Sequence, residues 1–371
     1  MKILQFGKYY PPVFGGIESV MFDLTEGLND IGHQCDVLCS NNVNEYVDEY
    51  YNNKYKVIRT PSLGKFASTS LSPKMIGALK KTHADYDIIH VHLPDPMANI
   101  ALNLISVKAK VVIHWHSDIV KQKFLKYLYA PVMIKLLERA DAIIATSEEY
   151  AKSSYWLQRY KSKVTIVPIG IKDPCQDMNL LTKPQSYNSK KIVFSLGRMA
   201  YYKGFEYLIK AAHYLTDEYK IVIAGGGELI EEYRKLIKDE GLDKRVELVG
   251  RISDKEINSY YHFSDLFCLP SVARSEAFGV VLLEAMAHSK PVVATNILGS
   301  GTSWVNKHTV SGLNVPICDS QAIANAITTI VNSEDLSNRY SLGARQRFEE
   351  NFTREEMVTK TEALYQKLVG E

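Results

Sequence analysis

Several features that would define a class of function are scarce in this sequence of 371 residues. No segment approaches the roughly 18 uninterrupted apolar residues that a membrane-spanning helix needs. The opening residues, MKILQFGKYYPP, do not have the pattern of a signal peptide, so we expect a cytoplasmic protein. The formal net charge is only +2, from 44 basic and 42 acidic residues, and this balance gives no reason to expect a nucleic-acid partner.

Cysteine is also sparse, and its spacing excludes the common metal-binding motifs. The five cysteines are scattered, without a CxxC pair or a Cys/His cluster at metal-binding spacing. Cys35, Cys39 and Cys268 lie in apolar segments, where we expect buried thiols. Tyrosine, in contrast, is abundant, with 23 residues against 12 phenylalanines and 3 tryptophans. Because tyrosine joins an apolar ring to a polar tip, this surplus indicates wet grooves or interfaces.

Short apolar segments alternate with longer amphipathic ones along most of the chain. In the first half we predict strands at 3–7, 35–39, 88–92, 111–115, 142–145 and 164–167, and helices at 17–32, 96–105, 124–139 and 147–157. In the second half we predict strands at 192–196, 220–224, 246–249, 266–269 and 291–294, then a helical tail from about residue 321. Segments apolar on both faces are typical of parallel strands beneath helices, so the alternation predicts the α/β class with doubly wound sheets.

The alternation lapses at about residues 170–190, where polar residues and two prolines predict an interdomain linker. We therefore predict two Rossmann-like domains, at 1–175 and 190–350, with the catalytic cleft between them. In open α/β sheets ligands bind beyond the carboxyl ends of the strands. The loops that follow the predicted strands are accordingly the places where candidate site residues should lie.

A glycine pair, Gly15 and Gly16, lies between the first predicted strand and an amphipathic helix. Such a turn lets backbone N–H groups approach a phosphate, and the helix N-terminus adds partial positive charge. The spacing is not GxGxxG, which disfavours a nicotinamide cofactor. A plain tight turn stays open as the alternative.

Two cations follow the first strand of the second half. Arg198 and Lys203 lie five residues apart, flanked by Gly197 and Gly204, which favour close backbone approach. A guanidinium group can bind two phosphate oxygens and an ammonium group acts as a mobile point charge, so the pair suits a diphosphate. A solvated charge pair is the alternative.

Two carboxylates, Glu276 and Glu284, lie eight residues apart in SEAFGVVLLEAMA. Carboxylates accept hydrogen bonds from sugar and ribose hydroxyls, whereas free N–H groups near Gly279 and Val280 would bind phosphate. Glu284 lies inside an otherwise apolar helix, where a carboxylate needs a partner.

Histidines occur as i, i+2 pairs on two strands: His90 with His92, and His114 with His116. A four-histidine metal site is one interpretation, but we favour strand-end histidines with satisfied hydrogen bonds. The acidic segment DYD at 85–87 precedes its strand, at the wrong end for a cleft, and we interpret it as a polar strand entry. We therefore predict no metal site.

Together and in this order, these motifs resemble the retaining GT-B glycosyltransferases of family GT4. The resemblance covers essentially the whole chain: PPVFGGIE, the DIIHVH strand, GRMAYYKG, the E-x7-E pair and a closing helix. It implies the GT-B fold, with a C-terminal helix at about 353–371 packing back on the first domain. It also implies that the enzyme requires no metal or other cofactor.

The resemblance also assigns roles to residues. Arg198 and Lys203 would hold the diphosphate of the donor, Glu284 the ribose, and Glu276 the transferred sugar. Gly16 would contact the diphosphate or the donor sugar from the first domain. The remaining donor-binding candidates are Gly15, Phe278, Gly279 and Val280.

His116 matches the histidine that the family carries in the catalytic cleft, and it would hydrogen-bond the donor sugar rather than act as a nucleophile. With Glu276, Arg198 and Lys203 it completes the catalytic candidates. Many GT4 members have an acidic residue in the loop that here reads Gly299-Ser300-Gly301-Thr302-Ser303. Backbone N–H groups and hydroxyls of Gly301, Thr302 and Ser303 could replace it.

HWHSDIVKQK and ILGSGTSWVNKHTVSG resemble more specifically the bacterial GT4 mannosyltransferases that assemble O-antigen or capsule polysaccharide. This resemblance implies a nucleotide-sugar donor, with GDP-mannose as the first choice and a UDP-sugar as the second. It implies a polyprenyl-pyrophosphate-linked saccharide as the acceptor and a new alpha linkage. A nucleotide-sugar 2-epimerase of the same fold is the alternative class, which the E-x7-E element disfavours.

A basic and aromatic segment indicates where the acceptor could bind. Lys121, Lys123 and Lys126 lie near Phe124, Tyr127 and Tyr129. Such a surface suits anionic lipid or a pyrophosphate-linked acceptor, so we expect peripheral binding at the inner face of the cytoplasmic membrane. Asp118 completes these acceptor or membrane candidates, and a solvated helix with its apolar side in the core is the alternative.

Overall fold

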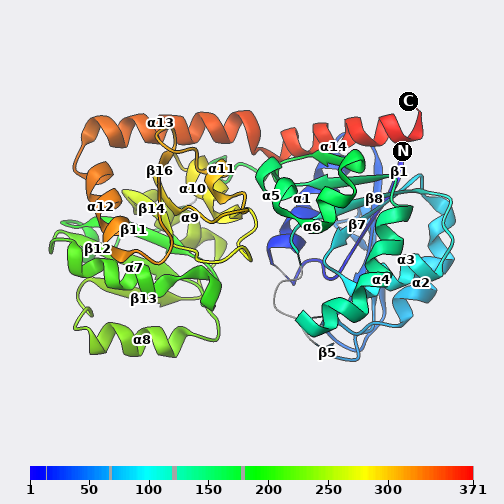
Figure 1. Cartoon of the computed structure of the whole chain (residues 1–371), viewed down its shortest axis with the longest axis horizontal. Coiled ribbons are helices and arrows are strands. Elements are labelled where there is room, and N and C mark those ends of the chain that lie inside the picture. The colour runs from blue at the N-terminus through cyan, green and yellow to red at the C-terminus, as the bar shows by residue number, and fades with distance from the viewer. Residues whose placement is uncertain (14, 67–68, 119–122, 177–179, 371) are drawn as a thin grey trace. The chain divides into compact units, whose positions relative to one another are not determined.

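The computed structural model describes residues 1–13, 15–66, 69–118, 123–176 and 180–370, without the side chains of 123–128. The chain forms two compact units, coloured along the sequence in Figure 1. Unit 1 comprises Met1–Lys172 and Arg354–Glu371, and unit 2 comprises Asp173–Thr353. Most of the linker predicted at 170–190 thus belongs to unit 2.

Unit 1 is built on an eight-stranded sheet with the order β10-β9-β8-β7-β1-β2-β4-β3. Its pairs are parallel except for β3 with β4, which run antiparallel. The strands are β1 (Lys2–Gly7), β2 (Gln34–Ser40), β3 (Val47–Tyr51), β4 (Tyr55–Thr60), β7 (Ile88–Leu93), β8 (Lys110–Trp115), β9 (Ala142–Ala145) and β10 (Val164–Ile166). A separate two-stranded ribbon consists of β5 (Lys65–Phe66) and β6 (Thr69–Ser70).

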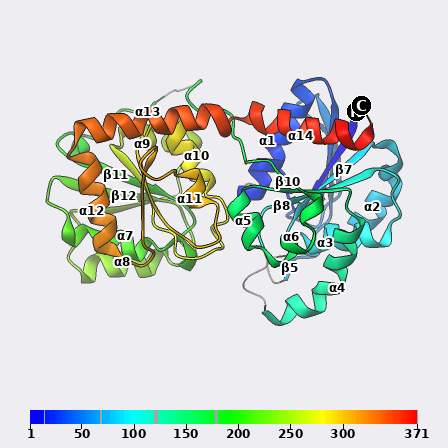
Figure 2. The ribbon, with the colours of Figure 1, turned by 45° about the horizontal axis from the view of Figure 1, so that its top comes forward.

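The helices of unit 1 form two groups. One contains α2 (Lys74–Thr82), α3 (Pro96–Leu104) and α4 (Lys123–Arg139), followed in the chain by α5 (Glu148–Ser153) and α6 (Tyr155–Arg159). The other pairs α1 (Gly16–Asp30) with α14 (Arg354–Val369), the red helix that lies along α1 in Figure 2. Gly27 of α1 permits this approach, because a Cβ atom there would collide with Val358 of α14.

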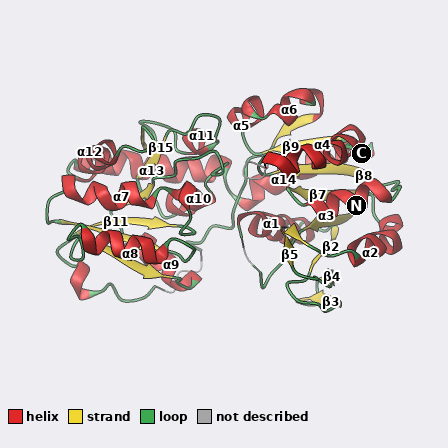
Figure 3. Ribbon diagram, turned by 60° about the horizontal axis from the view of Figure 1, so that its bottom comes forward, coloured by secondary structure: helices red, strands yellow, loops and turns green. Residues whose placement is uncertain are grey.

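Unit 2 contains a fully parallel six-stranded sheet with the order β13-β12-β11-β14-β15-β16. Its strands are β11 (Lys191–Leu196), β12 (Tyr219–Ala224), β13 (Val246–Gly250), β14 (Leu266–Leu269), β15 (Val292–Thr295) and β16 (Gly312–Val315). Its helices are α7 (Phe205–Ala211), α8 (Ile230–Asp239), α9 (Asp254–Phe263), α10 (Val280–Ala287), α11 (Thr302–Val305), α12 (Ser320–Val331) and α13 (Glu334–Asn351). Figure 3 shows helices on both sides of the strands.

The alternation of side chains along the strands of unit 2 explains this layering. Val193 and Ile221 face a core shared with α7, α8 and α12. Phe194, the next residue of β11, points the other way and packs against Tyr261 of α9 at a ring-centroid distance of 5.1 Å. Strands apolar on both faces need helices on both faces, so the predicted α/β class with two doubly wound units is confirmed.

Several parts of the fold differ from the sequence expectations. The antiparallel strand β3 was not predicted, because the segment VDEYY is mostly exposed and lacks an apolar stretch. The more buried strands β4 and β16 were not predicted either. The tyrosine surplus in the sequence predicts wet grooves or interfaces, but Tyr10 is buried in a tyrosine cluster where its hydroxyl bonds that of Tyr55 at 2.8 Å. Tyr51 stacks on Tyr55, so part of the tyrosine surplus forms core. The prediction for Cys35, Cys39 and Cys268 is confirmed, since all three are buried.

Among the described residues, no helix combines the length and the apolar character that crossing a bilayer requires.

Candidate active site

A buried ion pair lies at the carboxyl edge of the unit 2 sheet. Lys203 Nζ is 2.6 Å from Glu276 Oε2, and Ser271 Oγ donates to the same oxygen at 3.0 Å. Both charged side chains are about nine-tenths buried, at 7% and 10% exposure. Burial is the largest single influence and lowers the pKa of Lys203, but Glu276, Tyr202 and Glu284 outweigh it and raise the pKa above its usual value. The ammonium group therefore stays charged.

Glycines shape the loops around this pair. The side chain of Lys203 lies over Gly197, where a Cβ atom would approach Lys203 Cε to 2.9 Å. Gly225, at φ +130°, could not carry a Cβ atom because it would collide with the Gly197 carbonyl oxygen. Gly204, the N-cap of α7, lies in the left-handed region at φ +62°. Close backbone approach at these positions requires glycine, which the sequence supplies in GR, KG and GGG.

Glu284 lies in the second turn of α10 with one hydroxyl partner. Tyr261 Oη is 3.0 Å from Glu284 Oε2 and also 3.0 Å from the Val281 carbonyl oxygen. Burial raises the pKa of Glu284 to about 7, an effect that the Tyr261 hydrogen bond and the charge of Lys203 reduce. The carboxyl group is thus poised to gain or lose its proton near neutral pH.

Arg198 is exposed at the same edge of the sheet. Its guanidinium carbon lies 5.8 Å from the Tyr202 ring centroid, and Lys203 Nζ lies 5.6 Å from that centroid. Tyr202 thus holds both cations near its ring by cation–π contacts. The structure brings together four of the donor-site candidates: Arg198, Lys203, Glu276 and Glu284.

The segment between the two glutamates is held internally. Phe278 is 3% exposed and packs against Trp304 and Phe352, so its side chain belongs to the core and only its backbone is available to a ligand. Gly279 caps α10 at φ +83°, and Val280 begins the helix. A side chain at position 279 would be strained, which explains glycine there.

The expectation for residues 301–303 is wrong in part. The Gly301 N–H donates to the Ala277 carbonyl at 2.8 Å, and the Thr302 N–H donates to Ser300 Oγ at 3.2 Å. Thr302 is also buried. These N–H groups stabilise the loop and are not open to a sugar, so of the three residues the partly exposed Ser303 is the one that keeps this prediction.

In unit 1, the predicted phosphate loop carries a carboxylate of its own. Gly15 is the N-cap of α1, and a Cβ atom there would lie 2.5 Å from Glu18 Oε2. Burial raises the pKa of Glu18, while its own backbone N–H and the cations Lys8 and Lys65 lower it. The helix N-terminus that includes Gly16 is thus partly occupied by an internal anion, and its role towards phosphate stays a prediction.

The structure gathers all four strand histidines on one face of the sheet, as a stacked column. His114 and His116 lie 4.2 Å apart with an 8° interplanar angle, and His90 and His92 lie 4.8 Å apart at 6°. His116 Nε2 lies 2.9 Å from His92 Nδ1. His90 Nδ1 bonds the Tyr365 hydroxyl of α14. Each of these three rings therefore makes at least one of the predicted hydrogen bonds.

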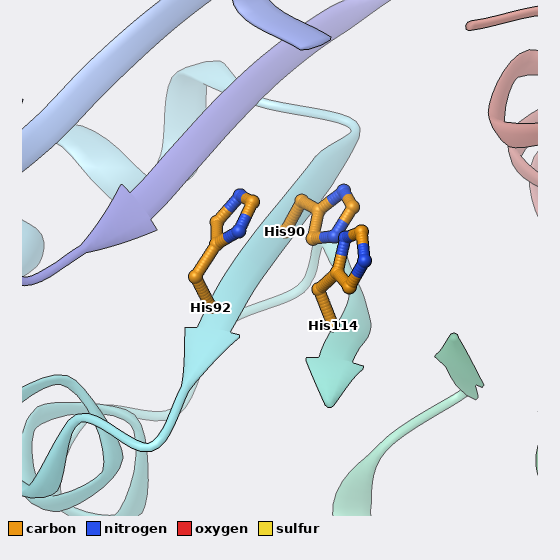
Figure 4. Close-up of side chains that lie close together, drawn as sticks. All are labelled: His90, His92 and His114. Carbon is orange, nitrogen blue, oxygen red and sulfur yellow. The ribbon is translucent and has the colours of Figure 1, made fainter. Parts of the chain in front are cut away.

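His114 departs from that expectation. Both of its ring nitrogens are buried without a hydrogen-bond partner among the described residues, as is Nε2 of His90. Figure 4 shows His90, His92 and His114 side by side on β7 and β8, and one ring nitrogen from each lies within 4.8 Å of the others. Imidazole nitrogens are good ligands for zinc, copper and nickel.

Charge argues against a metal ion at this cluster. The described ligand group contains only these three histidines and no Asp, Glu or Cys that would balance a dication. Burial lowers the pKa of His114 to about 3 and those of His90 and His92 well below the usual value. Burying a dication without an anion is costly, so we interpret the cluster as a neutral column.

The acceptor candidates are only partly described. Asp118 Oδ1 accepts hydrogen bonds from Trp115 Nε1 at 3.1 Å and Ser154 Oγ at 2.7 Å, and the Asp118 N–H donates to Tyr150 Oη at 2.6 Å. These contacts anchor the chain after β8. The remaining candidates lie outside the described side chains: Lys121, Lys123 and Lys126.

Sequence reasoning missed the residues that support the candidates. Tyr261, Ser271 and Gln5 each bond a candidate residue or the ring beside it, at separations of 5 to 87 residues. His92 was singled out in the sequence, but its contact with His116 was not predicted. The sequence did offer one unused signal for the crowded loops around the site. The GGG segment after β12 indicates close backbone approach, because it places three glycines at the end of a strand.

Comparisons with known proteins identify the family of this chain. Residues 14–173 match the family described as Glycosyltransferase Family 4, and residues 179–347 match Glycosyl transferases group 1. O-antigen chain mannosyltransferase C of Escherichia coli is 35% identical over 100% of this chain and 99% of its own. D-rhamnosyltransferase WbpZ of Pseudomonas aeruginosa is 30% identical over 95% of this chain and 92% of its own.

Solved structures show the same fold. A sucrose-phosphate synthase from Thermosynechococcus elongatus has a TM-score of 0.82 at 22% identity and covers both chains fully. Anabaena HepE in complex with UDP has a TM-score of 0.79 at 19% identity, over 99% of this chain and 100% of its own. With both family matches in order along the chain and full-length relatives, this protein belongs to the family 4 glycosyltransferases of the GT-B fold.

Proposed function

We propose that this glycosyltransferase moves mannose from GDP-mannose to a hydroxyl group of a polyprenyl-pyrophosphate-linked saccharide, with retention and an alpha linkage, during O-antigen synthesis. The full-length similarity to an O-antigen mannosyltransferase carries the choice of sugar and pathway. The similarity to a D-rhamnosyltransferase supports it, because D-rhamnose is 6-deoxymannose and shares the configuration of mannose.

The charges at the carboxyl edge of the unit 2 sheet suit the proposed donor. Cleavage of a glycosyl phosphate places negative charge on the departing diphosphate. Arg198 is exposed and Lys203 is held as an ammonium group, so both can oppose that charge. Glu276 already holds Lys203 Nζ at 2.6 Å, which fixes the ammonium group before the donor arrives.

The remaining groups would orient hydroxyls. Glu284, with a pKa of about 7, can accept hydrogen bonds from the ribose as a carboxylate. Glu276 and His116 would orient hydroxyls of the transferred sugar. The described residues need no metal for these roles, and we propose none.

A donor panel tests the proposal. Purified protein is heated with GDP-mannose, GDP-D-rhamnose, UDP-glucose or UDP-N-acetylglucosamine, all at the same concentration. A donor whose dissociation constant lies a hundredfold below that concentration should add about 2.7 kcal/mol of stability, or roughly 5–10 °C in the melting temperature, whereas a nucleotide sugar that binds weakly should add much less. Stabilisation by a UDP-sugar alone would replace GDP-mannose as the donor, and stabilisation by GDP-D-rhamnose alone would replace the sugar.

Product analysis separates transfer from isomerisation. With donor alone, a 2-epimerase would change the configuration of the sugar at C2, whereas a transferase needs the acceptor for net turnover. The acceptor would be a synthetic polyprenyl-pyrophosphate saccharide in anionic vesicles. Sedimentation with those vesicles tests the proposed position at the inner membrane face. An alpha-linked product supports retention, and a beta-linked one would contradict it.

A further inference from the structure

A line of three side chains runs through the core of unit 1 to His116. Gln5 on β1, His92 on β7 and His116 after β8 come from three strands that lie side by side in the sheet. His92 Nε2 lies 2.8 Å from Gln5 Oε1, and His92 Nδ1 lies 2.9 Å from His116 Nε2. The exposed fraction rises along this line from 0% for Gln5 and 1% for His92 to 7% for His116.

The hydrogen bonds determine which nitrogens carry protons. A carbonyl oxygen can only accept, so the contact with Gln5 Oε1 requires the His92 proton on Nε2. A neutral imidazole has one proton, and His92 Nδ1 must therefore accept. The partner that donates to it is His116 Nε2, and His116 Nδ1 is left with a lone pair.

The contact with His92 defines which end of the Gln5 amide belongs to this line. Gln5 Oε1 lies within hydrogen-bond distance of His92 Nε2, and Gln5 Nε2 is buried without a hydrogen-bond partner among the described residues. With the amide reversed, its nitrogen would face His92, and every proton along the line would move to the opposite nitrogen.

The stacked rings keep the line neutral. Burial lowers the pKa of His116 well below its usual value, and the neighbouring rings of His114 and His90 lower it further. A ring that resists protonation is a poor general base, but it still accepts a hydrogen bond. The column of histidines therefore favours hydrogen-bond acceptance over proton transfer.

We infer that Gln5 and His92 are positioning residues that hold His116 as the Nε2–H tautomer, so that its Nδ1 accepts a hydrogen bond from a sugar hydroxyl of the substrate. The inference rests on the proposed transfer reaction. It sets the direction of the hydrogen bond at His116: the sugar hydroxyl donates and the imidazole accepts.

Histidine tautomers can be measured directly in the unaltered protein. The full chain is labelled with ¹⁵N in its ten histidine rings, and long-range ¹H–¹⁵N spectra distinguish protonated from unprotonated ring nitrogens. His92→Gln and His116→Gln assign the two signals. We expect the proton on Nε2 in both rings. A proton on Nδ1 of His116 would overturn the inference, whatever donor the panel identifies.

A variant pair connects the tautomer with turnover. Gln5→Met keeps the volume and removes the acceptor, so the signals of His92 and His116 should report mixed tautomers and kcat/KM should fall about tenfold, the worth of one hydrogen bond. His114→Leu changes the packing of the same column but removes no hydrogen bond, because neither ring nitrogen of His114 has a partner among the described residues. It should leave the His116 tautomer unchanged and alter kcat/KM by no more than twofold.

Two results would separate failure of the inference from failure of the proposed function. Equal losses in both variants would show that the column acts only through packing, which would overturn the inference while the transfer reaction stands. Full transfer by His116→Ala would overturn the acceptor role of this ring. Should Gln5→Met not fold, the spectra of the unaltered protein still decide.

Discussion

Glu284 should make the protein less stable as the pH rises from 4.5 to about 7. Its pKa is raised by burial from 4.5 to about 7. Between these values the unfolded chain releases the proton while the folded protein keeps it, so stability falls as the pH rises from 4.5 to 7, and the loss is complete above 7.

The size of this effect follows from the pKa difference. At 1.36 kcal/mol per pKa unit, the distance from 4.5 to about 7 corresponds to about 3 kcal/mol. Because the Glu284 side chain is partly exposed, this figure is an upper limit. Glu284→Gln keeps the shape and an oxygen that can accept from the Tyr261 hydroxyl, but it removes the ionisation.

Thermal unfolding of the two proteins from pH 4.5 to 8.5 measures the difference. Glu284→Gln should melt within about 1 °C of the unaltered protein at pH 4.5 and up to about 10 °C higher at pH 8. The same variant should bind the donor more weakly, because an amide lacks the charge that strengthens a hydrogen bond from a ribose hydroxyl. Stability and donor affinity would thus change in opposite directions.

Glu232→Gln on α8 is the matched control, since Glu232 is exposed. It should give the same melting curve as the unaltered protein at every pH. A Glu284→Gln protein that is no more stable at pH 8, or whose advantage does not grow with pH, would refute the assignment of a raised pKa to this carboxyl group.

Three further predictions concern other contacts. Lys203→Met should destabilise unit 2 by about 3–5 kcal/mol, because it leaves the Glu276 carboxylate buried without its cation. In a thermal double-mutant cycle, the double variant with Glu276→Leu should recover much of this loss, and strictly additive losses would contradict the pairing. Gly27→Ala should lower the free energy of unfolding by about 1–3 kcal/mol, because the new methyl group collides with Val358. Val358→Ala in the same chain should restore stability in thermal unfolding, and a double variant that stays as unstable as Gly27→Ala would contradict this collision. Arg198→Ala should leave the melting temperature unchanged, since the side chain is exposed, but lower kcat at saturating donor at least tenfold; unchanged kcat would remove Arg198 from the reaction.

The sequence predicts those parts of the molecule that local pattern determines. The strand β14, with the wholly apolar sequence LFCL, was found because apolar character on both faces identifies a covered parallel strand. The exposed strand β3 has no such pattern, and its pairing with β4 depends on contacts that the local sequence does not encode.

The candidate site divides in the same way. Arg198, Lys203, Glu276 and Glu284 could be chosen from charge and spacing next to glycines. Their direct partners could not, because the Lys203–Glu276 pair joins residues 73 positions apart and the fold alone brings them together. The hydrogen bonds of Gly301 and Thr302 illustrate the same limit, since the availability of an N–H group depends on tertiary contacts.

The α1–α14 pair makes unit 1 discontinuous in the chain, and this has a consequence during synthesis. All of unit 2, residues 173–353, emerges from the ribosome before the residues of α14 do. Unit 2 can therefore fold first, and during that time the side of α1 near Gly27 is exposed because α14, which packs against it, has not yet been made. The Tyr365 hydroxyl, which bonds His90, arrives later still. A nascent chain would thus complete the surroundings of its histidine column only at the end of translation, when chaperone binding to exposed α1 should cease.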